Sequence, residues 1–218
     1  MKLPLSRIVF GVLLLACASS LTSCDDEASK QKAKLEALKF SNTMTWGPEY
    51  LSWAQKAPDL PGVGVLPPPA NTSAETKEDL RVMHEYQAAR TAAQIEEIKS
   101  EIDIYNARFG DKTFAEHLDE KRRPNSFYLM AFVIQIEGPQ VMKQKLRYDR
   151  VRPSFLDPTL KPVIPIPPHA AYPSGHATQA FLRAFLLSRL DPKNSRAYVQ
   201  SAERIARNRE IAGLHYPS

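Results

Sequence analysis

The pattern of apolar and polar residues after the N-terminal leader is helical, and no stretch has the alternation expected of a β-strand. A Ser or Thr followed three residues later by Glu or Gln forms a capping box, which marks a helix start. Three such pairs occur: Thr72 with Glu75, Thr91 with Gln94, and Thr113 with Glu116. They predict helices over about 72–87 and 91–105, and a third short helix from residue 113.

The central part of the chain predicts one strongly apolar helix. Ser126–Ile136 is its most apolar stretch and spans about three turns, so we expect a buried core helix. Gly138-Pro139 should bend or end this helix, because a proline removes a backbone donor and clashes with the preceding turn. Val141–Arg147 is expected to continue as a cationic helix.

Two further helices are predicted near the end of the chain. Residues 177–190 place four large apolar side chains on one side of a helix: Phe181, Leu182, Phe185 and Leu186. Asp191-Pro192 ends this helix, and a final helix is expected over about 194–212. On that last helix, a 4-3-4-3 spacing defines the stripe that should face the core, made of Tyr198, Ala202, Ile205, Arg209 and Ala212.

These elements predict an all-α helical bundle of residues 66–218. Residues 25–65 are expected to form an N-terminal tether and irregular segment, with a polar helix over 27–40 and a proline-rich irregular stretch over 46–69. Residues 151–173 form a second long stretch rich in proline. Loops of that length in compact domains tend to be functional.

Composition excludes some classes of partner. The 218 residues are 43% hydrophobic and 24% charged, which is ordinary for one soluble globular domain. The formal net charge of +5 is mild, and no basic block or basic–aromatic stripe argues for nucleic acid. Eighteen prolines against eight glycines predict stiff connections between the helices.

The first 24 residues have the features of an export signal rather than of the fold. A short basic segment precedes an apolar run over residues 8–16 that is too short to span a bilayer. Leu21-Thr22-Ser23-Cys24 resembles a bacterial lipobox, which predicts lipidation at Cys24. Cys17 is a weaker second candidate, and cleavage near Ala18 to release a free protein is a third. The prediction is therefore an exported, periplasmic or cell-envelope protein, anchored to a membrane as a lipoprotein.

Three short motifs suggest chemistry. The first, Lys145 to Pro153, reads K-x6-R-P, and the second is Pro173-Ser174-Gly175-His176 at a helix start. Such a start, made of small residues, is suited to an anion because several N–H groups lack partners and the helix dipole is positive there. The third motif reads R-x5-H from Arg209 to His215.

Arg209 adds a separate argument for an anion. It falls on the stripe that should be buried, and Ile205 and Gly213 occupy the positions four residues away, where a carboxylate would pair with it. A bound phosphate would supply the missing partner, because a guanidinium fork matches phosphate oxygens. A snorkelling arginine is the alternative.

The three motifs in this order resemble the signature of the type 2 phosphatidic acid phosphatase and vanadium haloperoxidase superfamily. The upstream Leu66-Pro67-Pro68-Pro69, Asp79 and Tyr86, together with the absence of membrane spans, look like the soluble class A non-specific acid phosphatases of bacteria. The resemblance covers residues 66–218. It implies a phosphomonoester hydrolase that acts through a phosphohistidine.

The resemblance also implies a role for each matched residue. His215 would be the nucleophile and His176 the general acid and base. The phosphoryl oxygens would be bound by a set of five residues: Lys145, Arg152, Ser174, Gly175 and Arg209. No metal or other cofactor is implied, although vanadate could bind the same site. His169 and Tyr172 lie close enough in sequence to line the pocket.

Two departures from the family pattern stand out. Asn208 occupies a position where the family commonly has serine. The family motif also continues H-x3-D, whereas the sequence stops at Ser218, one residue before that aspartate. In serine proteases, loss of the aspartate that orients the histidine costs about 10⁴ in rate. We therefore expect the sequence to be a truncated form of an active member.

Two alternatives to an exported phosphatase stay open. A vanadate-dependent haloperoxidase would use the same residues, because vanadate mimics the phosphoryl transition state. If the chain truly ends at Ser218, a catalytically impaired, lipid-anchored binding protein is the other. The sequence identifies no leaving group, and an oligomer is possible.

Overall fold

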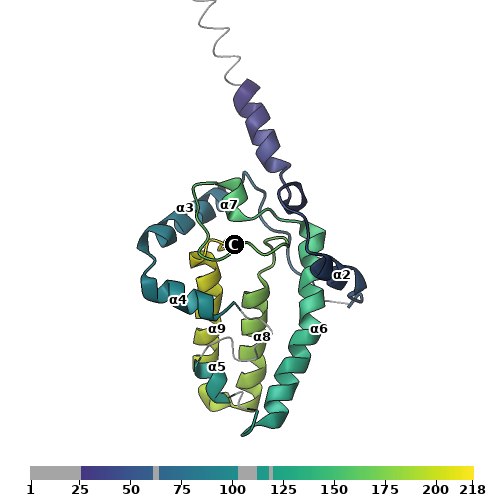
Figure 1. Cartoon of the computed structure of the whole chain (residues 1–218), viewed down its shortest axis with the longest axis vertical. Coiled ribbons are helices and arrows are strands. Elements are labelled where there is room, and N and C mark those ends of the chain that lie inside the picture. The colour runs from purple at the N-terminus through teal and green to yellow at the C-terminus, as the bar shows by residue number, and fades with distance from the viewer. Residues whose placement is uncertain (1–25, 61–63, 103–111, 118–119) are drawn as a thin grey trace, which may run out of the picture. The chain divides into compact units, whose positions relative to one another are not determined.

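The structure is a computed structural model that describes residues 26–60, 64–102, 112–117 and 120–218 (Figure 1). The expected signal segment, including Cys17 and Cys24, lies outside these residues. The chain divides into two compact units, Met1–Ala37 and Leu38–Ser218. Within the first unit, residues 26–36 form an exposed polar helix with an ion pair of 2.6 Å between Lys30 and Asp26. The expected polar helix over 27–40 thus ends earlier than predicted.

The second unit is helical. Its described residues contain no strand, only a single bridge between Lys39 and Arg150. In chain order the elements are η1 (Phe40–Asn42), α2 (Pro48–Lys56), α3 (Ala74–Ala89), α4 (Ala92–Ser100), α5 (Lys112–His117), α6 (Pro124–Tyr148), α7 (Pro153–Leu156), α8 (Gly175–Leu190), η2 (Pro192–Asn194) and α9 (Ser195–Ile211). The predicted all-α fold is confirmed. No described helix has the length and apolarity needed to cross a bilayer.

The α8–α9 pair forms the centre of the unit. Only η2 separates the two helices, so they run antiparallel and pack along their length (Figure 1). Their shared core contains Ala180, Ala184 and Leu187 from α8, and Tyr198, Ala202 and Ile205 from α9. The small residues let the two backbones approach closely. As a result, the last turn of α9 lies beside the first turn of α8.

The buried faces agree with prediction for α9 but not for α8. Every residue of the predicted α9 stripe is buried, including Arg209. On α8, however, Phe181 and Phe185 are exposed, and the buried side carries Gln179, Ala180, Arg183, Ala184 and Leu187. The face of α8 that is buried is therefore the one whose small residues allow close packing against α9, and not the one with the largest apolar side chains.

Helix α6 is longer than the apolar pattern predicts. It is one continuous helix through Pro139, so the expected end at Gly138-Pro139 is wrong. Proline removes a hydrogen bond there at a cost of about 3 kcal/mol, and α2 and α8 pack against this helix and hold it together. Within the apolar stretch, Met130 and Ile134 are buried, whereas Phe132 and three other large side chains are exposed: Tyr128, Leu129 and Ile136.

The N-terminal part of the unit also differs from expectation. Helix α2 occupies part of the stretch predicted to be irregular; it begins with Pro48 at its first position and packs on α6. The compact unit consequently begins at Leu38 rather than at residue 66. The predicted helix end near residue 105 lies outside the described residues.

The predicted capping boxes are confirmed at one helix of three. At α4, Thr91 and Gln94 form the expected box. At α3, the cap is Ser73, which accepts a hydrogen bond from the Thr76 N–H, and not Thr72. Helix α5 exists as predicted, but it begins at Lys112, so Thr113 lies inside it.

Two leucines of α8 offer a matched test of this packing. Leu187 is 2% exposed in the α8–α9 core, and Leu190 is 54% exposed at the end of the same helix. We expect Leu187→Ala to lower the free energy of unfolding by about 2–5 kcal/mol, because it leaves a cavity in the core. Leu190→Ala should change it by no more than about 0.5 kcal/mol. Denaturant titrations measure both, and equal effects would contradict the assigned core.

Candidate active site

The first turn of α8 provides the base of the site. Ser174 is the N-cap residue, and its Oγ accepts a hydrogen bond from the Ala177 N–H at 3.4 Å. Gly175 is the first helical residue; a Cβ there would come within 3.8 Å of Val141 Cγ1 and no closer to any other group. The backbone of this turn is therefore accessible to a neighbouring group. Backbone N–H groups at a helix start point outward along the axis, and together with the helix dipole they favour an anion at this position.

Lys145 is one of two buried cations held almost entirely by carbonyl groups. It lies in the last turn of α6, fully buried, and its Nζ donates to the carbonyl of Ala170 at 2.8 Å and to that of Ala171 at 3.4 Å. Burial, followed by the charge of Arg152, holds the pKa of Lys145 well below its ordinary value. A bound anion next to Lys145 would thus stabilise the protonated form of its amine.

Arg152 is the second of these cations and connects two segments. It is fully buried at the N-cap of α7, and its Nε and Nη2 donate to the carbonyl of His169 at 3.1 and 2.8 Å. Its Nη1 donates to the carbonyl of Leu214 at 2.9 Å and lies 3.1 Å from Nε2 of His215. Among the described residues, no carboxylate forms an ion pair with Lys145 or Arg152.

His215 is brought to this cluster by the turn after α9. Gly213 has φ of +78°, a conformation that favours glycine, and a Cβ there would lie 3.3 Å from Pro162 Cα. Because a guanidinium can only donate, Nε2 of His215 accepts from Arg152 and carries no proton. Burial, then the charges of Arg152 and Lys145, hold the pKa of His215 well below 6.5. His215 is therefore a neutral imidazole with its lone pair directed at a cation.

Arg209 has a carboxylate partner, contrary to the prediction from the sequence. It is buried in the last turn of α9, and its Nη2 forms an ion pair with Glu101, the C-cap residue of α4. Glu101 also accepts from Asn208 Nδ2 at 2.8 Å. The partner thus comes from another helix rather than from four residues away. Even so, Nε and Nη1 of Arg209 are buried and make no hydrogen bond within the described residues.

His176 lies in the first turn of α8, on the side of Glu101. Its Nε2 is 2.8 Å from the backbone carbonyl of Glu101, so Nε2 carries a proton and donates it. Burial, followed by the charge of Arg209, lowers the pKa of His176 to about 3. The charge of Lys145 acts in the same direction. His176 is therefore neutral at neutral pH in the absence of a bound anion.

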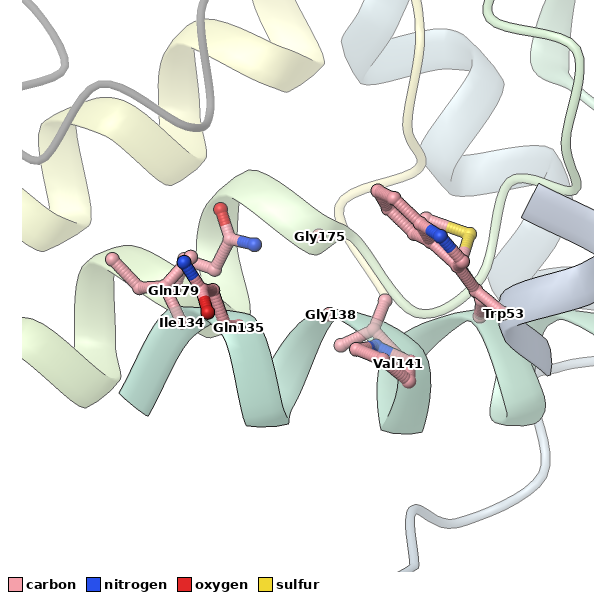
Figure 2. A pocket seen from close by; sticks show the side chains of 9 residues that line it. Trp53, Ile134, Gln135, Gly138, Val141, Gly175 and Gln179 are labelled. Carbon is pink, nitrogen blue, oxygen red and sulfur yellow. The ribbon is translucent and has the colours of Figure 1, made fainter. Parts of the chain in front are cut away.

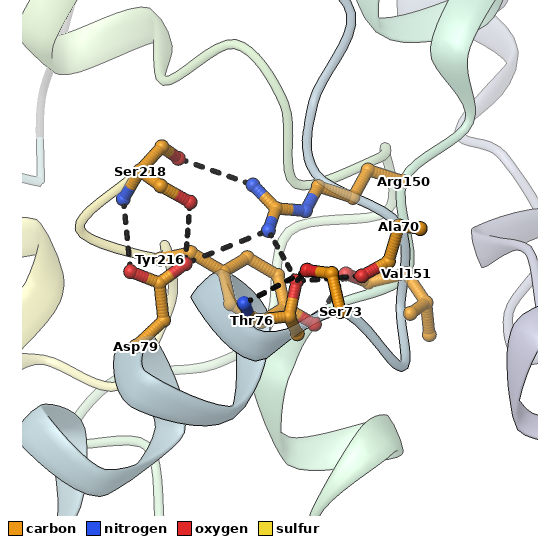
Figure 3. Close-up of polar contacts among 8 residues, drawn as sticks. All are labelled: Ala70, Ser73, Thr76, Asp79, Arg150, Val151, Tyr216 and Ser218. Atoms are coloured by element: carbon orange, nitrogen blue, oxygen red, sulfur yellow. Dashed lines mark hydrogen bonds and ion pairs between the residues drawn. The ribbon is translucent and has the colours of Figure 1, made fainter.

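A polar network fixes the segment that follows His215 (Figure 3). The Ser218 N–H and Oγ both donate to Asp79 of α3, the former at 3.2 Å, and Arg150 Nη1 donates to the Ser218 carbonyl at 3.1 Å. The Arg150 guanidinium also lies over the ring of Tyr216, 3.8 Å from its centroid. In the same network, Thr76 accepts from Arg150 Nη2 at 3.4 Å. Asp79, which is part of the family resemblance noted in the sequence, thus holds the segment that follows His215.

The predicted site residues converge at the start of α8. The charges of Arg152 and Lys145 lower the pKa of His215, and those of Arg209 and Lys145 lower the pKa of His176. Ser174 and His215 line a common cavity of about 190 Å³, and Tyr172 lines it as well. Cys24 lies outside the described residues.

Two residues of the cluster were not assigned by sequence reasoning. His169, expected only as a possible substrate contact, instead positions Arg152 through its carbonyl and its Nδ1, which lies 3.1 Å from Arg152 Nη2. Glu101 was missed altogether, because it pairs with a residue 108 positions away. No signal in a single sequence marks either contact.

The three motifs that resemble the signature of the type 2 phosphatidic acid phosphatase and vanadium haloperoxidase superfamily thus lie together at one helix start of a helical fold. Comparisons with known proteins confirm the resemblance to that superfamily, although no protein family model matches the chain.

The chain is 22% identical over 191 residues to a non-specific acid phosphatase of Providencia stuartii, covering 84% of this chain and 77% of the phosphatase. In fold it is similar to a bacterial vanadium-dependent iodoperoxidase, with a TM-score of 0.57 and 16% identity over 83% of this chain. It spans 57% of the peroxidase chain.

The depressed pKa of His176 predicts how stability depends on pH. Its folded-state pKa of about 3 lies below the value of about 6.5 expected for an unfolded histidine. Between these values the unfolded chain binds a proton that the folded protein does not, so the free energy of unfolding should fall as pH falls from about 6.5. His176→Asn should make this decline shallower. Urea titrations at about pH 7 and about pH 5 test it; the same decline in both proteins would contradict the assignment.

Proposed function

We propose that the protein is a phosphomonoester hydrolase of the acid phosphatase kind, which acts through a phosphohistidine intermediate. The buried cations at the start of α8 are the observation that carries this proposal. Arg152 lies 3.1 Å from Nε2 of a neutral histidine, and neither Arg152 nor Lys145 forms an ion pair within the described residues. A phosphoryl group would offset both charges. The sequence similarity to a bacterial acid phosphatase supports the same class.

In this proposal the phosphoryl oxygens bind where the donors of three cations meet. Arg152 and Lys145 contribute charge, and Arg209 contributes Nε and Nη1, which make no hydrogen bond within the described residues. The Gly175 N–H and the Ser174 hydroxyl complete the set at the helix start. Because the three cations are buried and fixed before substrate arrives, little reorganisation accompanies the reaction.

His215 is proposed to attack phosphorus through Nε2, once Arg152 Nη1 has moved its hydrogen bond from Nε2 to a phosphoryl oxygen. As the P–N bond forms, the bond between phosphorus and the ester oxygen breaks in line with it. A neutral imidazole is required, and the lowered pKa of His215 supplies it at any pH near neutrality. Water then attacks the phosphohistidine, the P–N bond breaks and inorganic phosphate leaves.

His176 is proposed to protonate the leaving alkoxide and later to deprotonate the attacking water. Its Nε2 proton is engaged with the Glu101 carbonyl, so the transferred proton is placed on Nδ1. The acid must be protonated first, although burial and the neighbouring cations hold the pKa of His176 at about 3. A bound phosphoryl dianion offsets the charges of Arg209 and Lys145 and raises that pKa. Substrate binding and protonation of His176 are thus coupled, which favours an acidic pH optimum.

Export and anchoring belong to the same proposal. Leu21-Thr22-Ser23-Cys24 supports lipidation at Cys24, followed by the hydrophilic residues Asp25, Asp26 and Glu27. The phosphatase domain would then lie in the periplasm or at the cell envelope, tethered by residues 25–37.

A vanadate-dependent haloperoxidase is the second candidate, because the fold is similar to that of a bacterial iodoperoxidase. Nε and Nη1 of Arg209 make no hydrogen bond within the part of the chain that the structure describes, and Lys145 and Arg152 are buried cations. These groups fit a tetrahedral oxyanion, whether phosphate or vanadate. Vanadate held there would supply peroxide activation. The residues of this chain would only bind it and keep it in place.

Phosphate release and halide oxidation distinguish the two candidates. We expect the full-length protein to release phosphate from a chromogenic aryl phosphate, and vanadate to inhibit that release competitively as a transition-state mimic. Halide oxidation with vanadate and peroxide but no phosphate release would overturn the phosphatase. Neither activity, with inorganic phosphate still bound, would favour the anchored binding protein.

Substitution of the two histidines should separate their roles. His215→Ala should abolish the acid-labile phosphoenzyme, because no nucleophile remains. His176→Ala should lower kcat by about 10²–10⁴, most severely for alkyl esters, whose alkoxides need protonation. Rapid-quench labelling and a series of esters of increasing leaving-group basicity measure these effects. A phosphoenzyme in His215→Ala, or equal losses for aryl and alkyl esters in His176→Ala, would contradict the mechanism.

A further inference from the structure

A second cavity opens beside the start of α8, away from His215. It has a volume of about 230 Å³ and lies between α2, α6 and α8 (Figure 2). Gly175 lines it, whereas Ser174 and His215 line the other cavity, and the two cavities have no lining residue in common. The same turn of α8 therefore faces the nucleophile on one side and this second cavity on the other.

The lining of this cavity is apolar and uncharged. Figure 2 shows the indole of Trp53 at one end, with Val141 nearby, and Ile134 at the other end. The polar side chains of the lining are two neutral amides, Gln135 and Gln179. Such a surface favours a flat, uncharged group and offers no charge to a carboxylate, an amine or a second phosphate.

We propose that this cavity binds the leaving group of the phosphomonoester and selects an uncharged aromatic alcohol. The inference rests on the proposed function, since in-line displacement places the leaving oxygen opposite His215. We place that side where Gly175 borders the cavity. An aromatic group carried by the leaving oxygen, directly or through a short alkyl chain, would extend from Gly175 towards the indole of Trp53.

Gly138 provides a way to fill the cavity without disturbing the cations. It lines the cavity from α6, and a Cβ at this position would meet no atom within 4 Å. Gly138→Leu therefore extends a side chain into open space. Gly138→Ala is its matched control, because it makes the same backbone change before Pro139 with little added volume.

Trp53→Ala removes the aromatic wall of the cavity. Leu51→Ala, on the same helix but outside the lining, controls for movement of α2.

The test compares two alkyl esters with poor leaving groups, 2-phenylethyl phosphate and glycerol 1-phosphate, in the full-length protein. We expect the wild type to prefer the phenylethyl ester in kcat/KM by about tenfold or more, the range for an apolar group in a fitted pocket. Trp53→Ala and Gly138→Leu should lower this ratio about tenfold, while Leu51→Ala and Gly138→Ala keep it. Glycerol 1-phosphate turnover should stay unchanged in all four variants, which shows that they are folded.

The results distinguish a failure of the leaving-group site from a failure of the proposed function. Release of phosphate from both esters with a ratio near one, or a ratio that neither Trp53→Ala nor Gly138→Leu alters, would overturn this inference alone. Release from neither ester would overturn the proposed function, and the leaving-group site with it.

Discussion

The burial of Lys145 and Arg152 is the constraint on which the rest of the structure depends. Placing two unpaired cations inside a protein costs several kcal/mol for each ion. Here the cost is offset by carbonyl groups of the proline-rich stretch and of the final turn: those of Ala170, Ala171, His169 and Leu214. Residues 169–171 of the stretch over 151–173 thus supply most of the acceptors for the two positive charges. The prolines of this stretch suit that purpose, because they fix φ and carry no backbone N–H that would need an acceptor of its own.

The short connection between α8 and α9 brings the other site residues together. Antiparallel pairing places the last turn of α9 beside the first turn of α8. The charge of Arg209 therefore acts on His176, although 32 residues lie between them in the sequence. Gly213 then reverses the backbone and returns His215 to the same place. The Asp79–Arg150 network holds the end of that segment from α3. The helix start, the cations and the histidines are consequently fixed by different elements that meet at one point.

Several features that depend on local sequence are predicted correctly, although the capping boxes at Thr72 and Thr113 are not. The all-α fold, the buried stripe of α9 and the Thr91 capping box all depend on residues within a few positions of one another, and each is confirmed. Where the outcome depends on tertiary packing, the prediction fails. Helix α6 continues through Pro139 because α2 and α8 pack on it, and α8 buries Gln179 and Arg183 rather than Phe181 and Phe185. Glu101 could not be found as the partner of Arg209, since nothing local connects them.

The full burial of Lys145 and Arg152 has a consequence for how an anion is attracted. Dissolved ions screen charges at a protein surface within about 8 Å at physiological ionic strength, but they screen buried charges much less. Binding that depends on these two side chains should therefore be nearly insensitive to salt concentration. The affinity of such a site for small oxyanions would be similar in dilute and in saline solution.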